Sequence, residues 1–174
     1  MMTPATANGR TDLPRRRGER PLTRPHNPHQ QLSQNAGIRL QESLWARMRS
    51  LPGVVAGPSL VSLPDTRALH LTPDLAHGPA QSFLAGTEFA HLHGPGDGSL
   101  HLCLPARLAG AAIAGGWAEP HPMAHTGLLP ASLLMVYGPR DADELEQVWL
   151  LVRGAYTYAR GTGGGRAARA CFER

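Results

Sequence analysis

Residues 88–104 read EFAHLHGPGDGSLHLCL, and this stretch predicts a β-hairpin that carries three histidines. Aliphatic and polar residues alternate on both sides of a turn at residues 94–98, and such alternation is typical of antiparallel strands with one buried face. Glycine and proline fill the turn, where they favour a reversal of the chain. We therefore expect both strands to pack their aliphatic side chains against a core.

The register of the hairpin decides which side chains share a face. We assume that the aliphatic residues of both strands, such as Leu92 and Leu100, lie on the same buried face. The residue numbers of each directly paired couple must then add up to an even number, as they do for His93 opposite His101. An odd sum would mix histidines with leucines on both faces. Burial therefore favours a second face that gathers His91, His93, His101 and Cys103.

The rest of the chain predicts helices and further strands. Apolar residues recur every three or four positions in residues 38–50, and Pro52 and Gly53 follow as a stop. Apolar residues recur with the same spacing after Asp141. We expect Asp141 to be the N-cap of this helix, with Glu144 three residues later as an acidic variant of the capping box. The expected helices are 38–50, 105–114 and 141–156, and the further strands are 54–63, 68–72 and 132–137. This pattern indicates an α+β fold in which about three helices pack against a mainly antiparallel sheet.

Polar segments flank this expected domain. Residues 1–33 hold six arginines and few large apolar side chains, and residues 161–174 are rich in glycine and arginine. Neither segment offers enough apolar surface to offset the entropy of ordering, so both are expected to be disordered tails. The expected folded domain is residues 34–160.

The net charge of +4 and the pI of 9.8 come from the two ends of the chain. Residues 36–159 carry seven arginines and ten acidic residues, so the expected domain is acidic. A specific nucleic-acid surface on the domain is therefore not expected. A nucleic-acid module that binds through its basic tails remains an alternative.

The sequence lacks the signals of several protein classes. No run approaches the roughly 18 apolar residues of a membrane helix, and the amino end has no apolar stretch typical of a signal peptide. A cytoplasmic protein without membrane contact is expected, with Cys103 and Cys171 as free thiols. Phosphate-loop, dinucleotide-binding, Gly-x-Ser-x-Gly and His-Glu-x-x-His motifs are absent, so nicotinamide or nucleotide chemistry is not expected.

Four of the nine histidines lie in or near the hairpin, namely His91, His93, His101 and His121. Imidazole titrates near neutral pH and also coordinates transition metals, so three interpretations stay open. The histidines could lie on a solvent-facing surface of the sheet. They could bind a divalent metal, with Glu88, Asp97 or Glu119 as carboxylate ligands. They could also move protons on an organic substrate without a metal.

Side chains next to these histidines are candidates for substrate binding. Trp117 and Tyr137 are able to stack on a planar ligand, although aromatic residues beside turns more often fill a core. The planar guanidinium of Arg140 is able to bind a carboxylate or an enolate, or to pair with Asp143 or Glu144.

Four stretches of the chain resemble one known family. They are residues 88–93 (EFAHLH), 100–104 (LHLCL), 116–124 (GWAEPHPMA) and 137–141 (YGPRD), and they contain all four candidate histidines. In this order and spacing they are similar to the luciferase domain of the fungal bioluminescence enzyme and its bacterial relatives. The resemblance covers residues 85–160.

The resemblance implies an oxygenase without an organic cofactor that takes dioxygen and a small planar substrate. In this chemistry dioxygen adds to an electron-rich enol, a 3-hydroxy-α-pyrone, and a cyclic peroxide then loses carbon dioxide with emission of light. His91 and His93 would serve as base and proton relay, and His101 and His121 would complete the pocket. Substrate contacts would come from Glu88, Trp117, Tyr137 and Arg140. The alternative is a non-catalytic or metal-dependent module that binds a small molecule through its histidines.

Overall fold

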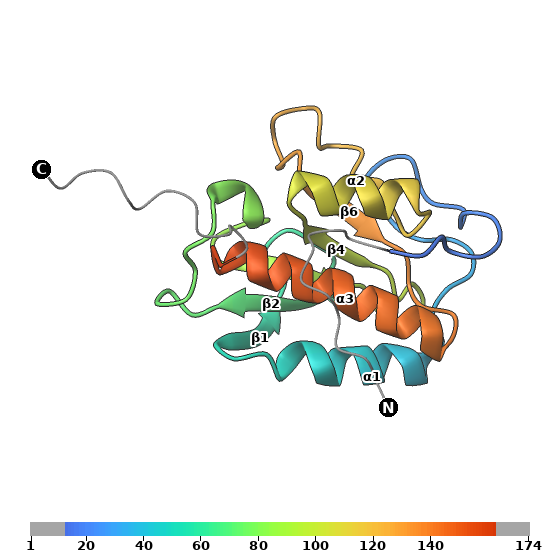
Figure 1. Cartoon of the computed structure of the whole chain (residues 1–174), viewed down its shortest axis with the longest axis horizontal. Coiled ribbons are helices and arrows are strands. Elements are labelled where there is room, and N and C mark those ends of the chain that lie inside the picture. Colours follow the sequence, from blue (N-terminus) through green and yellow to red (C-terminus); the bar gives the residue numbers. More distant parts are fainter. Residues whose placement is uncertain (1–12, 163–174) are drawn as a thin grey trace, which may run out of the picture.

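The hairpin lies in the middle of a six-stranded antiparallel sheet with the strand order β1-β2-β3-β4-β6-β5. The computed structural model describes residues 13–162. Along the chain the elements are α1 (Ile38–Arg49), β1 (Val54–Pro58), β2 (Arg67–Leu71), the short 3-10 helix η1 (Ala80–Ser82), β3 (Glu88–Leu92), β4 (Leu100–Cys103), α2 (Ala106–Ala114), β5 (Ala118–Pro120), β6 (Leu133–Val136) and α3 (Ala142–Ala159). All three helices lie on one side of the sheet (Figure 1). The α+β class with about three helices is confirmed.

The register between β3 and β4 places the histidines opposite the helices. His91 pairs directly with His101, and Leu92 pairs with Leu100. The residue numbers of each pair add up to an even number, so the predicted register of the hairpin is confirmed. The leucines of both strands are fully buried in the main core, which the helices cover. Cys103 lies on the histidine face, where it is buried beside other apolar side chains. Burial raises the pKa of its thiol to about 12, which fits an unreactive cysteine.

Helix α3 begins where its capping residue predicts. Asp141 has extended backbone, and its carboxylate accepts a hydrogen bond from the backbone N–H of Glu144. Leu145, Val148 and Val152 then recur on one face and are buried in the core. Within residues 13–162, no helix combines the length and the apolar character that a membrane crossing would require.

Two strands differ from the expectation. Strand β1 ends at Pro58, so residues 59–63 form a loop that turns toward the histidine face. Strand β5 was not expected, because three residues that end in proline show no alternation. It pairs with β6, and residues 118–120 thereby lead directly to His121.

The expectation of disorder was wrong for residues 13–33. This segment, here called the arm, crosses the end of the sheet and pairs with polar groups that the core presents (Figure 1). The indole N–H of Trp117 donates to the carbonyl of Pro14 at 2.6 Å, and the backbone N–H of Gly138 donates to Oε1 of Gln31 at 2.9 Å. Residues 1–12 and 163–174, also expected to be disordered, lie outside the described residues.

A buried ion pair fixes the arm to the start of α3. The side chains of Arg16 and Glu144 are 2% and 4% exposed, and Arg16 donates to Glu144 Oε2 at 3.2 Å. Arg140 donates to the same carboxylate through its side chain and its backbone N–H. The Glu144 carboxylate therefore pairs with two guanidinium groups from segments far apart in the sequence.

Replacing Asp141 by alanine is expected to lower the free energy of unfolding by about 1 kcal/mol, because the N-cap acceptor of α3 is lost. Urea denaturation followed by circular dichroism measures this change. Asp143→Ala is the matched control, since Asp143 is exposed in the same helical turn and accepts no capping hydrogen bond from Glu144. Equal losses in the two variants would contradict the capping role.

Candidate active site

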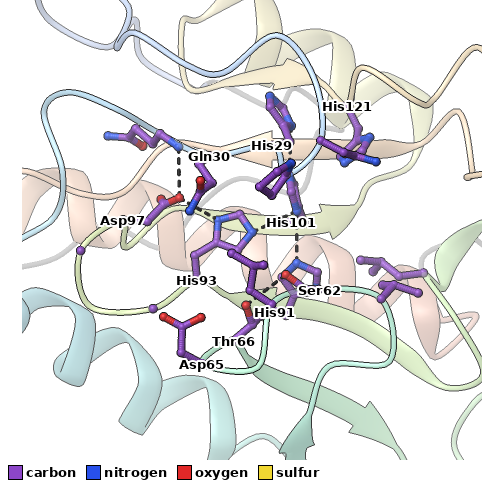
Figure 2. A pocket seen from close by; sticks show the side chains of 18 of the residues that line it. His29, Gln30, Ser62, Asp65, Thr66, His91, His93, Asp97, His101 and His121 are labelled. Carbon is purple, nitrogen blue, oxygen red and sulfur yellow. Dashed lines mark hydrogen bonds and ion pairs between the residues drawn. The ribbon is translucent and has the colours of Figure 1, made fainter.

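Five buried histidines gather on the face of the sheet opposite the helices (Figure 2). Their exposed fractions lie between 1% and 5%. Two come from β3 and its end, one from β4, one from the loop after β5 and one from the arm. They are His91, His93, His101, His121 and His29, here called the histidine cluster. This burial excludes the interpretation of a solvent-facing sheet surface.

A cavity of about 650 Å³ opens onto the histidine cluster. All five histidines line it, together with the arm and the loop that follows β1. Apolar side chains stand at its rim, where Leu32, Val61 and Leu63 are 55%, 48% and 40% exposed. The cavity therefore has a floor of histidines, and its entrance combines these apolar side chains with the exposed Asn27 and Asp65. Apolar surface with a few polar groups is common in small-molecule sites.

Glu88 orients His91 from behind. Its carboxylate lies 2.7 Å from His91 Nδ1 and also accepts hydrogen bonds from the Ser59 hydroxyl and the Leu60 N–H. Burial alone would raise the pKa of Glu88, but these hydrogen bonds lower it, so the group is a carboxylate. Because a carboxylate only accepts, we assign the proton of His91 to Nδ1, which leaves a lone pair on Nε2.

Asp97 and Ser99 orient His93 in the same way. His93 Nδ1 lies 2.9 Å from Ser99 Oγ and 3.3 Å from Asp97 Oδ2. The Ser99 hydroxyl donates to Asp97, so its oxygen accepts the proton of His93 Nδ1. Burial would raise the pKa of Asp97, but the hydrogen bond from His93 lowers it. His93 thus also has its lone pair on Nε2.

His101 lies at the centre of the histidine cluster. Its Nδ1 is 3.1 Å from both His91 Nε2 and His93 Nε2, and its Nε2 is 3.1 Å from His29 Nδ1. Burial holds the pKa of His101 well below its ordinary value, and the neighbouring imidazoles lower it further. Burial also lowers the pKa of His91, although Glu88 opposes the shift. Both rings are therefore neutral at physiological pH.

His29 continues this chain to a third carboxylate. Its Nε2 lies 2.8 Å from Glu119 Oε1, and the Tyr137 hydroxyl donates to Glu119 Oε2 at 2.9 Å. Burial would raise the pKa of Glu119, but the hydrogen bond from His29 lowers it. The proton of His29 is thus on Nε2, and its Nδ1 accepts from His101 Nε2–H.

His121 has a different orientation. Its Nδ1 accepts the backbone N–H of Met123 at 3.1 Å, so the neutral ring carries its proton on Nε2. Burial lowers the pKa of His121 to about 4. The ring packs edge-on against His101 and His29, with centroids 4.8 Å and 5.0 Å away. His121 is therefore a hydrogen-bond donor at neutral pH.

The four histidines named from the sequence come together, but the four candidate substrate contacts lie behind the cavity wall. Trp117 is buried in the core, and Tyr137 hydrogen-bonds Glu119 with a pKa that burial raises to about 12. Arg140 pairs with Glu144, and Glu88 supports His91. Among residues 13–162, none of these four side chains lines the cavity.

The sequence did not identify His29. It lies in the arm, 62 positions before His91, directly after Pro28 and without a helical or strand period. Only the contacts of the folded chain bring it to His101. The only local signal was an unusual density of histidine and proline in residues 25–29.

Two groups of three histidines have the spacing to hold a metal ion. One group is His91, His93 and His101, and the other is His29, His101 and His121. In each group the available ring nitrogens lie within 4.8 Å of one another. His101 belongs to both groups, so one of its two nitrogens faces each set.

The chain is similar in sequence to one family model and to several known proteins. Residues 86–155 match a family model described as Luciferase domain. Luciferases of Armillaria ostoyae and Armillaria mellea are 28% identical over 162 residues, which is 84% of this chain and 61% of each relative. A luciferase of Neonothopanus nambi is 33% identical over 73 residues, which is 41% of this chain and 27% of that protein.

The chain thus spans about three fifths of the length of the Armillaria luciferases it matches. No solved structure matches it significantly. The Luciferase domain match contains His91, His93, His101 and His121, whereas His29 precedes it.

Proposed function

From the similarity of residues 86–155 to fungal luciferases, we propose that this protein is a luciferase-type oxygenase. It would add dioxygen to an electron-rich enol such as a 3-hydroxy-α-pyrone. The observation that carries the proposal is the meeting of three imidazole lone pairs at the floor of the cavity, supported by hydrogen bonds that end at carboxylates.

The basicity of these lone pairs suits the first step of such a reaction. An enol must lose its proton before its ring can give an electron to dioxygen. His91 Nε2 and His93 Nε2 are the lone pairs that would accept this proton, because their Nδ1 protons are held from behind. The arrangement is that of a carboxylate-supported imidazole base.

His121 would contribute a hydrogen bond to the anion that forms. Its Nε2–H is free of the Met123 contact, and a donor held in a fixed position stabilises developing negative charge. The electrons for the reduction of dioxygen come from the enolate itself. New carbon–oxygen bonds then lead to a cyclic peroxide that releases carbon dioxide, so no redox cofactor is needed.

The shape of the cavity supports a planar organic substrate. Its volume of about 650 Å³ accommodates a bicyclic or smaller conjugated molecule. The apolar rim at Leu32, Val61 and Leu63 would cover the faces of such a ring, while its oxygens reach the histidine cluster.

Oxygen uptake with a panel of 3-hydroxy-α-pyrones and their 3-methoxy analogues tests the proposal. Wild-type protein is expected to consume dioxygen and release carbon dioxide only with the free hydroxyl, because the methyl ether has no proton to lose. Light is recorded in the same vessel. Tight binding of the pyrones without oxygen uptake would overturn the oxygenase and favour a non-catalytic binding module.

A further inference from the structure

We infer that His91, His93 and His101 form a binding site for one divalent transition-metal ion. The ligand atoms are His91 Nε2, His93 Nε2 and His101 Nδ1, which lie around one point at the floor of the cavity. The inference rests on the direction of each hydrogen bond in the histidine cluster.

The first two lone pairs are fixed by groups behind the rings. The Glu88 carboxylate holds the proton of His91 on Nδ1, and the Ser99 oxygen with Asp97 holds the proton of His93 on Nδ1. Both Nε2 atoms then carry lone pairs, and both point at His101 Nδ1.

The third lone pair is fixed through the arm. Glu119 holds the proton of His29 on Nε2, so His29 Nδ1 is an acceptor. His101 Nε2 lies 3.1 Å away and must donate to it. A neutral imidazole has one N–H only, so His101 Nδ1 is left with a lone pair as well.

Three lone pairs therefore meet with no proton between them. A single added proton would satisfy only one of the two contacts of 3.1 Å, and the remaining nitrogen would stay unpaired in a buried site. A cation between the three nitrogens satisfies all of them at once. The carboxylates of Glu88, Asp97 and Glu119 supply compensating negative charge from behind.

The spacing of the nitrogens fits such an ion. Metal–imidazole bonds of roughly 2.0–2.1 Å place neighbouring nitrogens about 2.8–3.4 Å apart in octahedral or tetrahedral sites. The two recorded distances to His101 Nδ1 are both 3.1 Å. Carboxylates behind metal-bound histidines are the usual outer contacts of these sites, and three imidazoles suit iron, copper, nickel or zinc.

The second group of histidines fits a metal less well. His121 Nδ1 accepts the Met123 N–H, so its other nitrogen carries the proton and offers no lone pair. His101 Nε2 is likewise a donor toward His29. Both nitrogens would have to lose their present hydrogen bonds, whereas the group of His91, His93 and His101 needs no change.

In the reaction, the ion would give the substrate a place to bind. Three ligands from one side leave coordination positions open toward the cavity, as in catalytic metal sites. A 3-hydroxy-α-pyrone offers a hydroxyl and a carbonyl oxygen on adjacent carbons, which suits two such positions. This part of the inference rests on the proposed function, and it means that the lone pairs act on the enol through the ion.

Metal titration of the full chain tests the site without turnover. Protein stripped with a chelator and checked for folding by circular dichroism is titrated anaerobically with Co²⁺, Fe²⁺ and Zn²⁺ by calorimetry. One equivalent is expected to bind, and Co²⁺ is expected to give visible d–d absorption. His93→Ala and His101→Ala are expected to abolish both signals. Glu88→Gln is expected to weaken binding about 10- to 100-fold.

Two further variants locate the ion. His77→Ala is the matched control, because His77 is exposed and does not line the cavity. His121→Ala is expected to keep one equivalent, since His121 belongs only to the other group. Loss of binding in His121→Ala with retention in His93→Ala would overturn the assignment in favour of the second group.

The outcomes separate this inference from the proposed function. If folded wild-type protein binds none of the three metals stoichiometrically, the metal site is overturned. If metal-free protein consumes oxygen at the full rate, the role of the metal in the reaction is overturned. A bound metal without oxygen uptake would overturn only the oxygenase.

Discussion

His101→Ala is expected to lower the rate of oxygen consumption about 10²- to 10⁴-fold, the range for loss of a positioned proton-transfer group. His101 contacts His91, His93 and His29, so its removal frees three rings at once. The loss is expected whether the lone pairs act directly or through a metal, because both uses need the same arrangement. Initial rates of oxygen uptake with a saturating 3-hydroxy-α-pyrone measure it.

His77→Ala is the control for this experiment. It makes the same chemical change at an exposed histidine that does not line the cavity, and it is expected to keep the wild-type rate. Thermal denaturation of both variants separates loss of activity from loss of fold. A folded His101→Ala protein with the wild-type rate would remove the histidine cluster from the reaction.

Glu144→Gln is expected to lower the free energy of unfolding by roughly 3 kcal/mol, because it leaves the buried guanidinium of Arg16 without a counter-charge. Arg140 loses the same partner at its backbone and side chain. Urea denaturation at neutral pH measures the change. Glu146→Gln is the matched control, since Glu146 lies on the same helix as Glu144 but makes an exposed ion pair with Arg47 of α1. Such pairs contribute less than about 1 kcal/mol.

The difference between wild type and Glu144→Gln is expected to depend on pH. Burial alone would raise the pKa of Glu144, but hydrogen bonds from Arg140 and the nearby Arg16 lower it below the ordinary value of 4.5. A carboxyl group with a lowered folded-state pKa stabilises the protein above its unfolded-state pKa and loses this contribution as the pH falls through the folded-state value. The difference should therefore be constant near neutral pH and shrink below pH 4.5. A difference that stays constant into strong acid would contradict the ion pair.

The hairpin could be predicted from the sequence because its information is local. Strand side chains alternate, so the leucines of residues 88–104 determine both the buried face and the position of the histidines opposite to it. The capped helix at Asp141 is local in the same sense, since cap and apolar period lie within one segment. His121 was a candidate because it lies near the hairpin in the sequence, and the family resemblance, not a period, connected it to the other three histidines.

The arm could not be predicted, because its order depends on contacts between distant residues. Composition correctly indicates that residues 13–33 bury little apolar surface. It does not show that Arg16 pairs with Glu144, or that Gln31 receives the Gly138 N–H and donates its own N–H to Asp97. Each contact satisfies a buried polar group that would otherwise destabilise the fold. The proton positions in the histidine cluster depend on the same long-range contacts.

The arm also determines when the site is completed during synthesis of the chain. Arg16 leaves the ribosome early, but its partner Glu144 follows 128 positions later, and the partner of His29 at Glu119 follows 90 positions later. The side chains of Arg16 and His29 therefore lack these partners until nearly the whole sheet and the start of α3 have been synthesised. Closure of the histidine cluster is a late event of folding, and a nascent chain cannot expose a finished site before its sheet exists.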